Sequence, residues 1–190
     1  MADIWASFCN NRETFIATDL WLDNSAVLEL TSVDGDLHAN IMIWLVAQVV
    51  NFMARRVLKY SKEEEKASWL RLWTSVQKWK AMDQASTEPI LILEPDSREK
   101  SACKDDSPFP QIICGSDSAG IVHIEYFYER TSLINSIVIA NIMYHTGCVL
   151  LLEQKEPDYP EDFEVYEPCE DQLYYHARRL CGIVRSNARP

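Results

Sequence analysis

Glycine is scarce in this chain, at 5 of 190 residues. None of the five belongs to a glycine-rich loop that could surround phosphate groups with backbone N–H groups. The stretch GSDSAG at 115–120 superficially suggests a nucleophile elbow, which needs glycine two residues before and two residues after its serine. Neither Ser116 nor Ser118 has glycine at both positions. The sequence therefore disfavours nucleotide-binding folds and an elbow serine, and it predicts a turn and a helix cap at 115–120.

Basic residues are outnumbered as well. The chain has 18 Lys and Arg against 29 Asp and Glu, which gives a net charge of -11 at pH 7. Because contact with nucleic acid depends on Lys and Arg that neutralise phosphates, we expect no direct nucleic-acid binding by this chain. Two local basic clusters have the size that is typical of a solvated helix face or a helix C-terminus. They consist of Arg55, Arg56, Lys59 and Lys62, and of Arg178, Arg179 and Arg185.

The six cysteines contain no C-x-x-C pair of the kind that a local zinc site would show. We expect neither a metal nor a cofactor. The N-terminal stretch has no basic start followed by a long apolar run, so we expect no secretory signal and an intracellular protein with reduced thiols. Cys148 and Cys181 fall within helical patterns, which favours small core residues over nucleophiles.

A long uncharged run dominates the rest of the chain. Residues 131–152 contain no Asp, Glu, Lys or Arg, and wound as a helix they are apolar in every direction. Such a helix must be buried on all sides, although its length would also suit a membrane span. Six small or polar residues favour a core helix and no membrane partner: Asn135, Ser136, Asn141, His145, Thr146 and Gly147. Helical spacing begins before the run, at 119–128, and a helix of this length is expected to bend near Ser132 or Gly147.

Four further stretches have helical spacing of apolar residues. Residues 2–22 favour one or two helical segments, and 38–60 favour a helix that is buried over a wide face. Ser61 begins the capping box S-K-E-E of a helix that runs to about residue 83. The last helix follows Glu170. Its predicted apolar stripe consists of Leu173, Tyr174, Ala177, Leu180, Cys181 and Val184.

The connections are irregular. Residues 85–118 contain four prolines and one short apolar run at 90–93, so they predict a long irregular loop with at most one short strand. Residues 153–171 are acidic and rich in proline, which is typical of an exposed loop. The sequence therefore predicts an all-α fold, a single domain over 1–190 with about six helices around the central helix 131–152.

The last helix also carries a motif. HARRLCGIVRSN at 176–187 resembles the HAR-x-x-CGI-x-x-SN segment of the regulatory domain found in fungal transcription factors of the zinc binuclear cluster class. Other stretches resemble segments of that domain in the same order. They are HANIMIWLVAQVVNF at 38–52, the tryptophan-rich helix from Trp69 to Trp79, and PFP at 108–110 followed by IANIMYHTGCVLLLEQKEP at 139–157.

The resemblance implies an all-helical domain that controls a transcription factor, in some members in response to a small molecule. The six-cysteine DNA-binding cluster of that class is missing, and an apolar helix over 121–136 is added. We therefore expect a stand-alone or truncated regulatory or interaction domain, nuclear in location, that binds a small apolar molecule, a protein partner or a second copy of itself. The alternative is a cytoplasmic enzyme of fungal secondary metabolism that catalyses a cyclisation or cycloaddition in an apolar pocket without a cofactor.

Polar groups that interrupt apolar helices are the first candidates for a site under either hypothesis. A ligand pocket combines an apolar lining with a few such groups, and a buried histidine bonded to a neighbouring helix explains the same pattern without a ligand. The tryptophans are candidate walls of the pocket or ordinary core residues. The candidate ligand-binding residues are Asn141, Tyr144, His145, Tyr175, His176, Trp44, Trp69 and Trp73.

Overall fold

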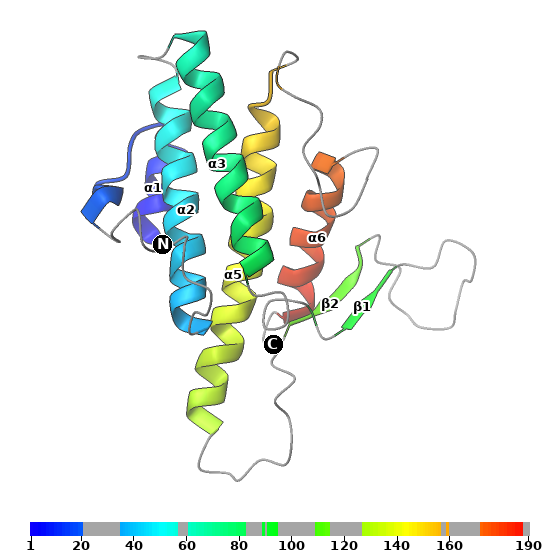
Figure 1. Cartoon of the computed structure of the whole chain (residues 1–190). Helices are drawn as coiled ribbons and strands as arrows, with labels where there is room; N and C mark the ends of the chain where they lie inside the picture. The colour runs from blue at the N-terminus through cyan, green and yellow to red at the C-terminus, as the bar shows by residue number, and fades with distance from the viewer. Residues whose placement is uncertain are drawn as a thin grey trace.

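The computed structural model describes residues 1–20, 35–56, 61–82, 89, 91–94, 109–114, 127–156, 159 and 172–187. Its helices are α1 (Ala2–Cys9), the short 3-10 helix η1 (Thr18–Leu20), α2 (Gly35–Arg56), α3 (Lys62–Met82), α5 (Phe127–Glu153) and α6 (Gln172–Asn187) (Figure 1). Two short strands accompany them, β1 (Leu91–Leu93) and β2 (Gln111–Ile113). The prediction of an all-α fold is therefore confirmed.

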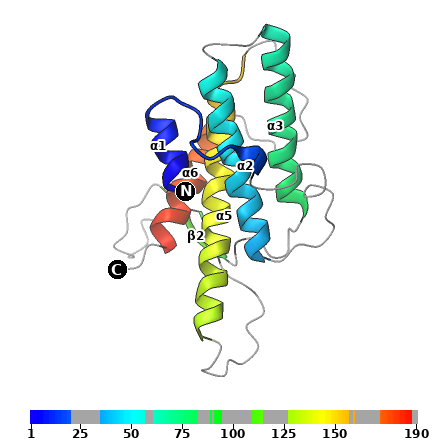
Figure 2. The same cartoon turned by 90° about the vertical axis from the view of Figure 1, so that its left-hand side faces the viewer.

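The helix α5 occupies the central position that the uncharged run predicts. It contacts α2 and α3 on one side and α6 on the other. In Figure 1, α2 and α5 run in one direction and α3 and α6 in the opposite one, with the two strands beside the end of α6. Figure 2 shows α1 lying against the side of α2, with which it is in contact.

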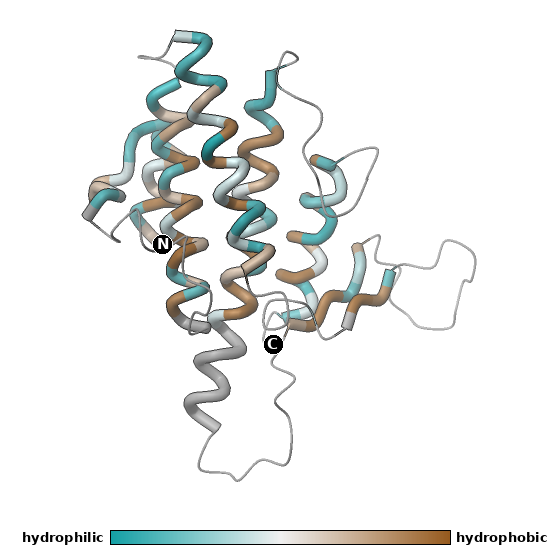
Figure 3. Tube along the Cα trace, viewed as in Figure 1, coloured by the Kyte–Doolittle hydropathy of each residue, from teal (hydrophilic) through white to brown (hydrophobic). Residues whose placement is uncertain are grey.

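Buried apolar residues form two hydrophobic clusters. The larger cluster joins α1, α2, α3 and α5, and it includes the whole tryptophan stripe of α3. The smaller cluster joins β2, α5 and α6, and its buried members are Ile112, Cys114, Ile137 and Ile183. Figure 3 shows hydrophobic residues recurring along α2 and α5, whereas hydrophilic residues gather at the first turns of α3.

The start of α3 has the predicted capping box. The Ser61 hydroxyl accepts a hydrogen bond from the Glu64 backbone N–H at 3.3 Å, and the Glu64 carboxylate accepts one from the Ser61 backbone N–H at 3.0 Å. Both backbone groups would otherwise lack a partner at the helix end. Arg56, at the end of α2, forms ion pairs with Glu65 of α3 and Glu156 beyond α5, so this member of the first basic cluster links helices and is not merely solvated.

The central helix is continuous from Phe127 to Glu153. It passes through Ser132 and Gly147 without ending, and the helix expected separately at 121–136 is, from Phe127 onward, its first part. Two stretches are long and apolar enough to cross a membrane by length and composition alone, 37–56 in α2 and 136–153 in α5. Most of each stretch is buried against the rest of the protein, 72% and 61% respectively.

The expectation of at most one short strand in 85–118 is wrong. β1 falls on the predicted apolar run, but it pairs antiparallel with β2, with Ile92 opposite Ile112. The strand β2 is fixed by α6 as well as by β1. The Ile112 backbone N–H donates to the Ser186 hydroxyl at 3.0 Å, and the Asn187 side-chain amide donates to the Ile112 carbonyl at 2.8 Å.

The apolar stripe predicted for α6 is also wrong in its orientation. Leu173, Tyr174 and Val184 are exposed, and so is Cys181, which is therefore not a core residue. The buried residues of α6 are His176, Gly182 and Ile183. The predictions for 115–120, 119–126 and 160–171 lie outside the described residues.

Candidate functional site

Four of the predicted site residues meet where α5 packs against α6. Tyr144 and His145 lie on α5, Tyr175 and His176 lie on α6, and 31 positions separate the two histidines in the sequence. Their Nδ1 atoms are 2.9 Å apart, which is a direct hydrogen bond between the imidazoles. Tyr144, His145 and His176 are each less than 10% exposed. The structure therefore places a polar group inside an otherwise apolar helix contact.

Both tyrosine rings contact the two imidazoles edge to face. The Tyr144 ring lies at 5.0 Å from the His145 ring and 5.7 Å from the His176 ring, with planes nearly perpendicular. The Tyr175 ring lies at 5.2 Å from His176 and 6.4 Å from His145. These separations suit the electrostatic attraction between a ring edge and a ring face. Edge contacts thus hold both imidazoles in one orientation.

Two residues that the sequence did not single out for the site complete it from the side of α3 and α5. The Tyr144 hydroxyl donates to the Gln77 side-chain oxygen at 3.2 Å, and the Gln77 amide nitrogen lies 3.6 Å from the Cys148 sulfur. The sequence around Gln77 gives no signal of a site, because Gln77 lies between Val76 and Lys78 on the tryptophan-rich helix. Only its half-buried position in the structure distinguishes it from a surface glutamine. We call Gln77, Tyr144, His145, Cys148, Tyr175 and His176 the polar cluster.

Two cations lie at the edge of the polar cluster. The Lys80 Nζ atom is 5.8 Å from the centre of the Tyr144 ring, and the Arg179 guanidinium carbon is 5.1 Å from the centre of the Tyr175 ring. Arg179 also forms an ion pair with Glu94, next to β1, at 2.9 Å. Positive charge on two sides makes a further positive charge on the His145 imidazole unfavourable.

Burial keeps both histidines uncharged at neutral pH, and for His145 the two cations add to this effect. Burial lowers the pKa of His145 well below 6.5, and His176, Lys80 and Arg179 lower it further. Burial lowers the pKa of His176 to about 4. Because both imidazoles are neutral, the Nδ1 atom of one histidine must carry the proton of this hydrogen bond. It donates to the lone pair on the Nδ1 atom of the other histidine.

The tyrosine and the cysteine of the polar cluster also stay protonated. Burial raises the pKa of the Tyr144 hydroxyl far above its usual value, and burial raises the pKa of the Cys148 thiol to about 12. A protonated thiol is a poor nucleophile and a poor metal ligand. The polar cluster therefore offers hydrogen-bond donors and acceptors and no activated nucleophile.

The remaining predicted site residues lie in the helix interiors. The Asn141 side chain is 1% exposed, and its amide donates to the Ile137 carbonyl one turn earlier at 3.0 Å. Trp69 stacks on Trp73 with ring centres 5.5 Å apart and donates its indole N–H to the Leu151 carbonyl. Trp44 donates its indole N–H to the Thr18 carbonyl at 2.8 Å. All three tryptophans are at most 2% exposed, so they fill the larger hydrophobic cluster.

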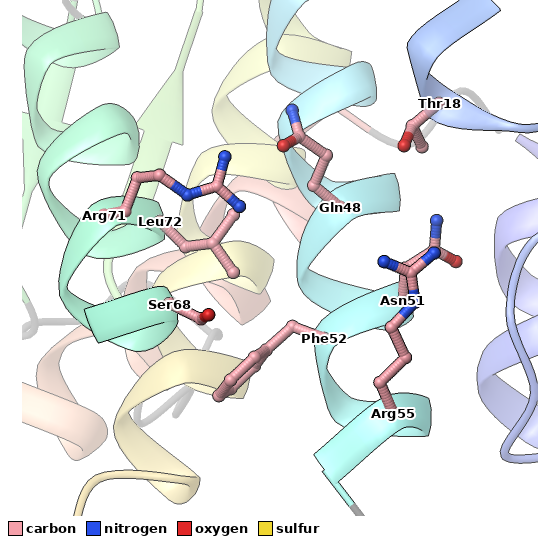
Figure 4. Close-up of a pocket in the computed structure, with 8 residues that line it drawn as sticks. All are labelled: Thr18, Gln48, Asn51, Phe52, Arg55, Ser68, Arg71 and Leu72. Atoms are coloured by element: carbon pink, nitrogen blue, oxygen red, sulfur yellow. The ribbon is translucent and has the colours of Figure 1, made fainter. Parts of the chain in front are cut away.

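A small cleft opens elsewhere, between α2, α3 and η1 (Figure 4). Its volume is about 60 Å³, and we call it the α2–α3 cleft. Its lining residues are Thr18, Gln48, Asn51, Phe52, Arg55, Ser68, Arg71 and Leu72. None of them is among the predicted site residues or in the polar cluster, although the stretch 38–52 contains Gln48, Asn51 and Phe52, and the first basic cluster contains Arg55.

Metal ligands are not grouped in the described ranges, where no three or more His, Cys, Asp and Glu side chains are placed to hold one ion. Comparison of the chain with family models, curated proteins and solved structures finds no match.

Proposed function

We propose that this protein is a ligand-responsive regulatory or interaction domain, related to the regulatory domain of fungal zinc binuclear cluster transcription factors. The observation that carries the proposal is the hydrogen bond between His145 and His176. It joins 139–157 and 176–187, two of the stretches that resemble that domain. A buried polar contact between two such stretches is the kind of feature that specifies how two helices pack.

The other residues of the 176–187 motif also have partners that suit a scaffold. A Cβ atom on Gly182 would lie 2.5 Å from the Pro110 carbonyl oxygen, so the glycine permits α6 to approach the PFP stretch. Ser186 and Asn187 hold the backbone of β2. The contacts of the 176–187 motif thus support a structural role, which does not require any of its residues to be catalytic.

Exposed aromatic residues favour a protein partner as the binding target. Trp5 and Phe8 on α1 are 42% and 38% exposed and touch edge to face, and Phe15 is 90% exposed. Aromatic side chains are enriched in protein interfaces relative to the rest of the surface. The tryptophans of α3, in contrast, are already packed against other residues of the chain and offer no wall for an apolar ligand.

A cofactor-free cyclase or cycloaddition enzyme is the alternative, and one observation favours it. Tyr144 and the two histidines form a hydrogen-bonding group in apolar surroundings, where hydrogen bonds to a developing charge are strongest. These groups are buried, so a substrate would have to displace packed side chains to reach them. The regulatory proposal needs no such opening.

The test is incubation of the purified chain with a metabolite extract of its source organism, followed by mass spectrometry of retained and converted compounds. Retention of a compound without conversion, or capture of a defined protein partner through the α1 surface, supports the regulatory proposal. Conversion of a compound into an isomer, abolished in Tyr144→Phe and retained in Tyr174→Phe, contradicts it and supports the enzyme. Tyr174 is a matched control because it is 60% exposed on α6.

A further inference from the structure

The charged residues that line the α2–α3 cleft have the opposite sign to the net charge of the whole chain. Acidic residues outnumber basic residues 29 to 18 in the sequence, yet among the described residues two arginines and no acidic residue line the cleft. Arg55 comes from α2 and Arg71 from α3, so the positive charges stand on different walls (Figure 4). A concave site with one sign of charge favours a ligand of the opposite sign.

Arg71 is the arginine that is available to a ligand. It is exposed, and in the described part of the chain it makes no hydrogen bond or ion pair. Arg55 already forms an ion pair with Glu13 at the outer side of the cleft. A guanidinium presents a planar set of donors that fits the two oxygens of a carboxylate.

Side-chain amides add neutral donors to the same cleft. Asn51 is 6% exposed, and its oxygen accepts a hydrogen bond from the Thr14 backbone N–H at 2.7 Å. This bond fixes the orientation of the amide, so the Asn51 NH₂ group remains as a donor. Gln48 lies one turn earlier on α2, and its amide faces the cleft across from Arg71 (Figure 4).

The floor of the cleft is apolar. Phe52 and Leu72, both buried, close its inner end between α2 and α3. The volume of about 60 Å³ holds a few water molecules or the acid group and short stem of a small molecule. The cleft thus has hydrogen-bond donors at its rim and apolar side chains at its floor. This arrangement suits an anion with a short apolar chain better than it suits a fully hydrated inorganic anion.

We infer that the α2–α3 cleft is a binding site for a small organic carboxylate. The guanidinium of Arg71 receives the carboxylate, the amides of Asn51 and Gln48 donate to its oxygens, and the apolar stem lies against Phe52 and Leu72. The cleft shares no residue with the polar cluster, so binding here does not depend on the hydrogen bond between His145 and His176.

The first experiment is a titration of the full chain followed by ¹H–¹⁵N NMR of the side-chain N–H groups of Asn51, Gln48 and Arg71. The probes are propionate, its neutral isostere propionamide, and inorganic phosphate. We expect saturable shifts of these signals with propionate at millimolar concentration, and weaker or no shifts with the other two. Equal shifts with propionamide would overturn the role of charge, equal shifts with phosphate would overturn the role of the apolar stem, and no shift with propionate would overturn the site.

The second experiment compares Arg71→Gln with Lys78→Gln. Both residues are exposed on α3, and two helical turns, about 10 Å, separate them. We expect Arg71→Gln to weaken propionate binding about tenfold or more, as loss of a charge-assisted hydrogen-bond pair does. Lys78→Gln removes the same charge and should change the affinity less than about twofold, because it lies outside the cleft. An equal loss in both variants would mean that only the general charge of α3 attracts the anion, and would overturn the assignment to the cleft.

Discussion

The larger and the smaller hydrophobic cluster bury their residues in different ways. The larger cluster is built from bulky side chains, among them Trp69, Trp73 and Trp79, each at most 1% exposed. The buried members of the smaller cluster among the described residues are Ile112, Cys114, Ile137 and Ile183, and five of the six residues of the polar cluster lie on the same helix pair, α5 and α6. On the side of the larger cluster, stability comes from the burial of large side chains. On the side of the smaller cluster, it depends on individual hydrogen bonds and close contacts.

The two sides also satisfy buried polar atoms differently. In the larger cluster, indole N–H groups donate to backbone carbonyls, Trp69 to Leu151 and Trp79 to His38. Neither partner in these bonds titrates. Between α5 and α6, the buried bond joins His145 to His176, and both imidazoles titrate. The face of α5 toward α6 therefore carries a titratable pair, His145 with His176, whereas the indole hydrogen bonds of the larger cluster do not depend on pH.

The largest expected effect is on the larger cluster. Trp69→Ala removes a stacked indole that is 1% exposed and a hydrogen bond to the Leu151 carbonyl. We expect the free energy of unfolding to fall by about 3–5 kcal/mol, measured by urea denaturation and circular dichroism. The control is Trp5→Ala, at a site that is 42% exposed, where the loss should stay below about 1 kcal/mol. Similar losses of unfolding free energy in both variants would show that the burial of large side chains is not what stabilises the larger cluster.

The next effect in size is a loss of stability in acid that comes from the histidine pair. Burial lowers the pKa of His176 in the folded protein from 6.5 to about 4. Between these values the unfolded chain binds a proton that the folded protein does not bind, so stability falls as the pH falls from 6.5 and the loss levels off near 4. A shift of this size corresponds to about 3 kcal/mol for this histidine.

Urea denaturation at a series of pH values between about 7 and 4 measures this loss. The carboxylates also titrate in part of this range, so the comparison is between the native sequence and His176→Gln. The slope of unfolding free energy against pH should be smaller in the variant by up to about one bound proton, because a glutamine side chain cannot titrate. Parallel slopes would mean that His176 binds its proton as readily in the folded protein as in the unfolded chain, which contradicts the lowered pKa of this histidine.

Two glycines, Gly147 on the side of the larger cluster and Gly182 on the side of the smaller one, also differ, and we expect their substitution to have a smaller effect on stability than the changes above. A Cβ atom at Gly182 of α6 would lie 2.5 Å from the Pro110 carbonyl oxygen, whereas one at Gly147 of α5 would meet Met42 and Val46 at 3.5 Å, an ordinary contact. We expect Gly182→Ala to destabilise the protein by about 1–3 kcal/mol. Gly147→Ala should be neutral or stabilising by up to about 1 kcal/mol, because alanine favours the helix. Thermal unfolding of both variants checks the difference, and equal melting temperatures would contradict the close approach of α6 to Pro110.

The larger cluster is also the side that local sequence pattern describes best. Apolar spacing and the Ser61 capping box predict α3 almost to its ends, because both depend on residues within one or two turns. The tryptophan stripe of α3 points to the core for the same reason. The central position of α5 follows from the absence of charged residues over 131–152.

The smaller cluster depends on residues that are distant in the sequence, and local pattern misses it. Hydropathy favours Leu173, Tyr174 and Val184 as the buried face of α6, but the face that packs carries His176 and Gly182. A polar side chain is buried there because His145 supplies its partner, and a glycine is buried there because the Pro110 carbonyl approaches closely. Neither partner can be identified from the helix itself. Two signals were available in the sequence: a histidine that interrupts an amphipathic helix, which placed His176 among the predicted site residues, and a glycine inside the same helix.

The smallest expected effect lies where the two sides meet. Tyr144 stacks on Trp79 of the larger cluster and touches both histidines, and its hydroxyl donates to Gln77. Tyr144→Phe keeps the ring and removes the hydroxyl, so it leaves the Gln77 side-chain oxygen without this donor. We expect a loss of about 1 kcal/mol, the usual net value of one such hydrogen bond. Tyr174→Phe, on the exposed side of α6, should change the unfolding free energy by less than about 0.5 kcal/mol. A loss of several kcal/mol in Tyr144→Phe would mean that the hydroxyl, and not ring packing, holds the polar cluster to α3, and the two sides would then be one cooperative polar core.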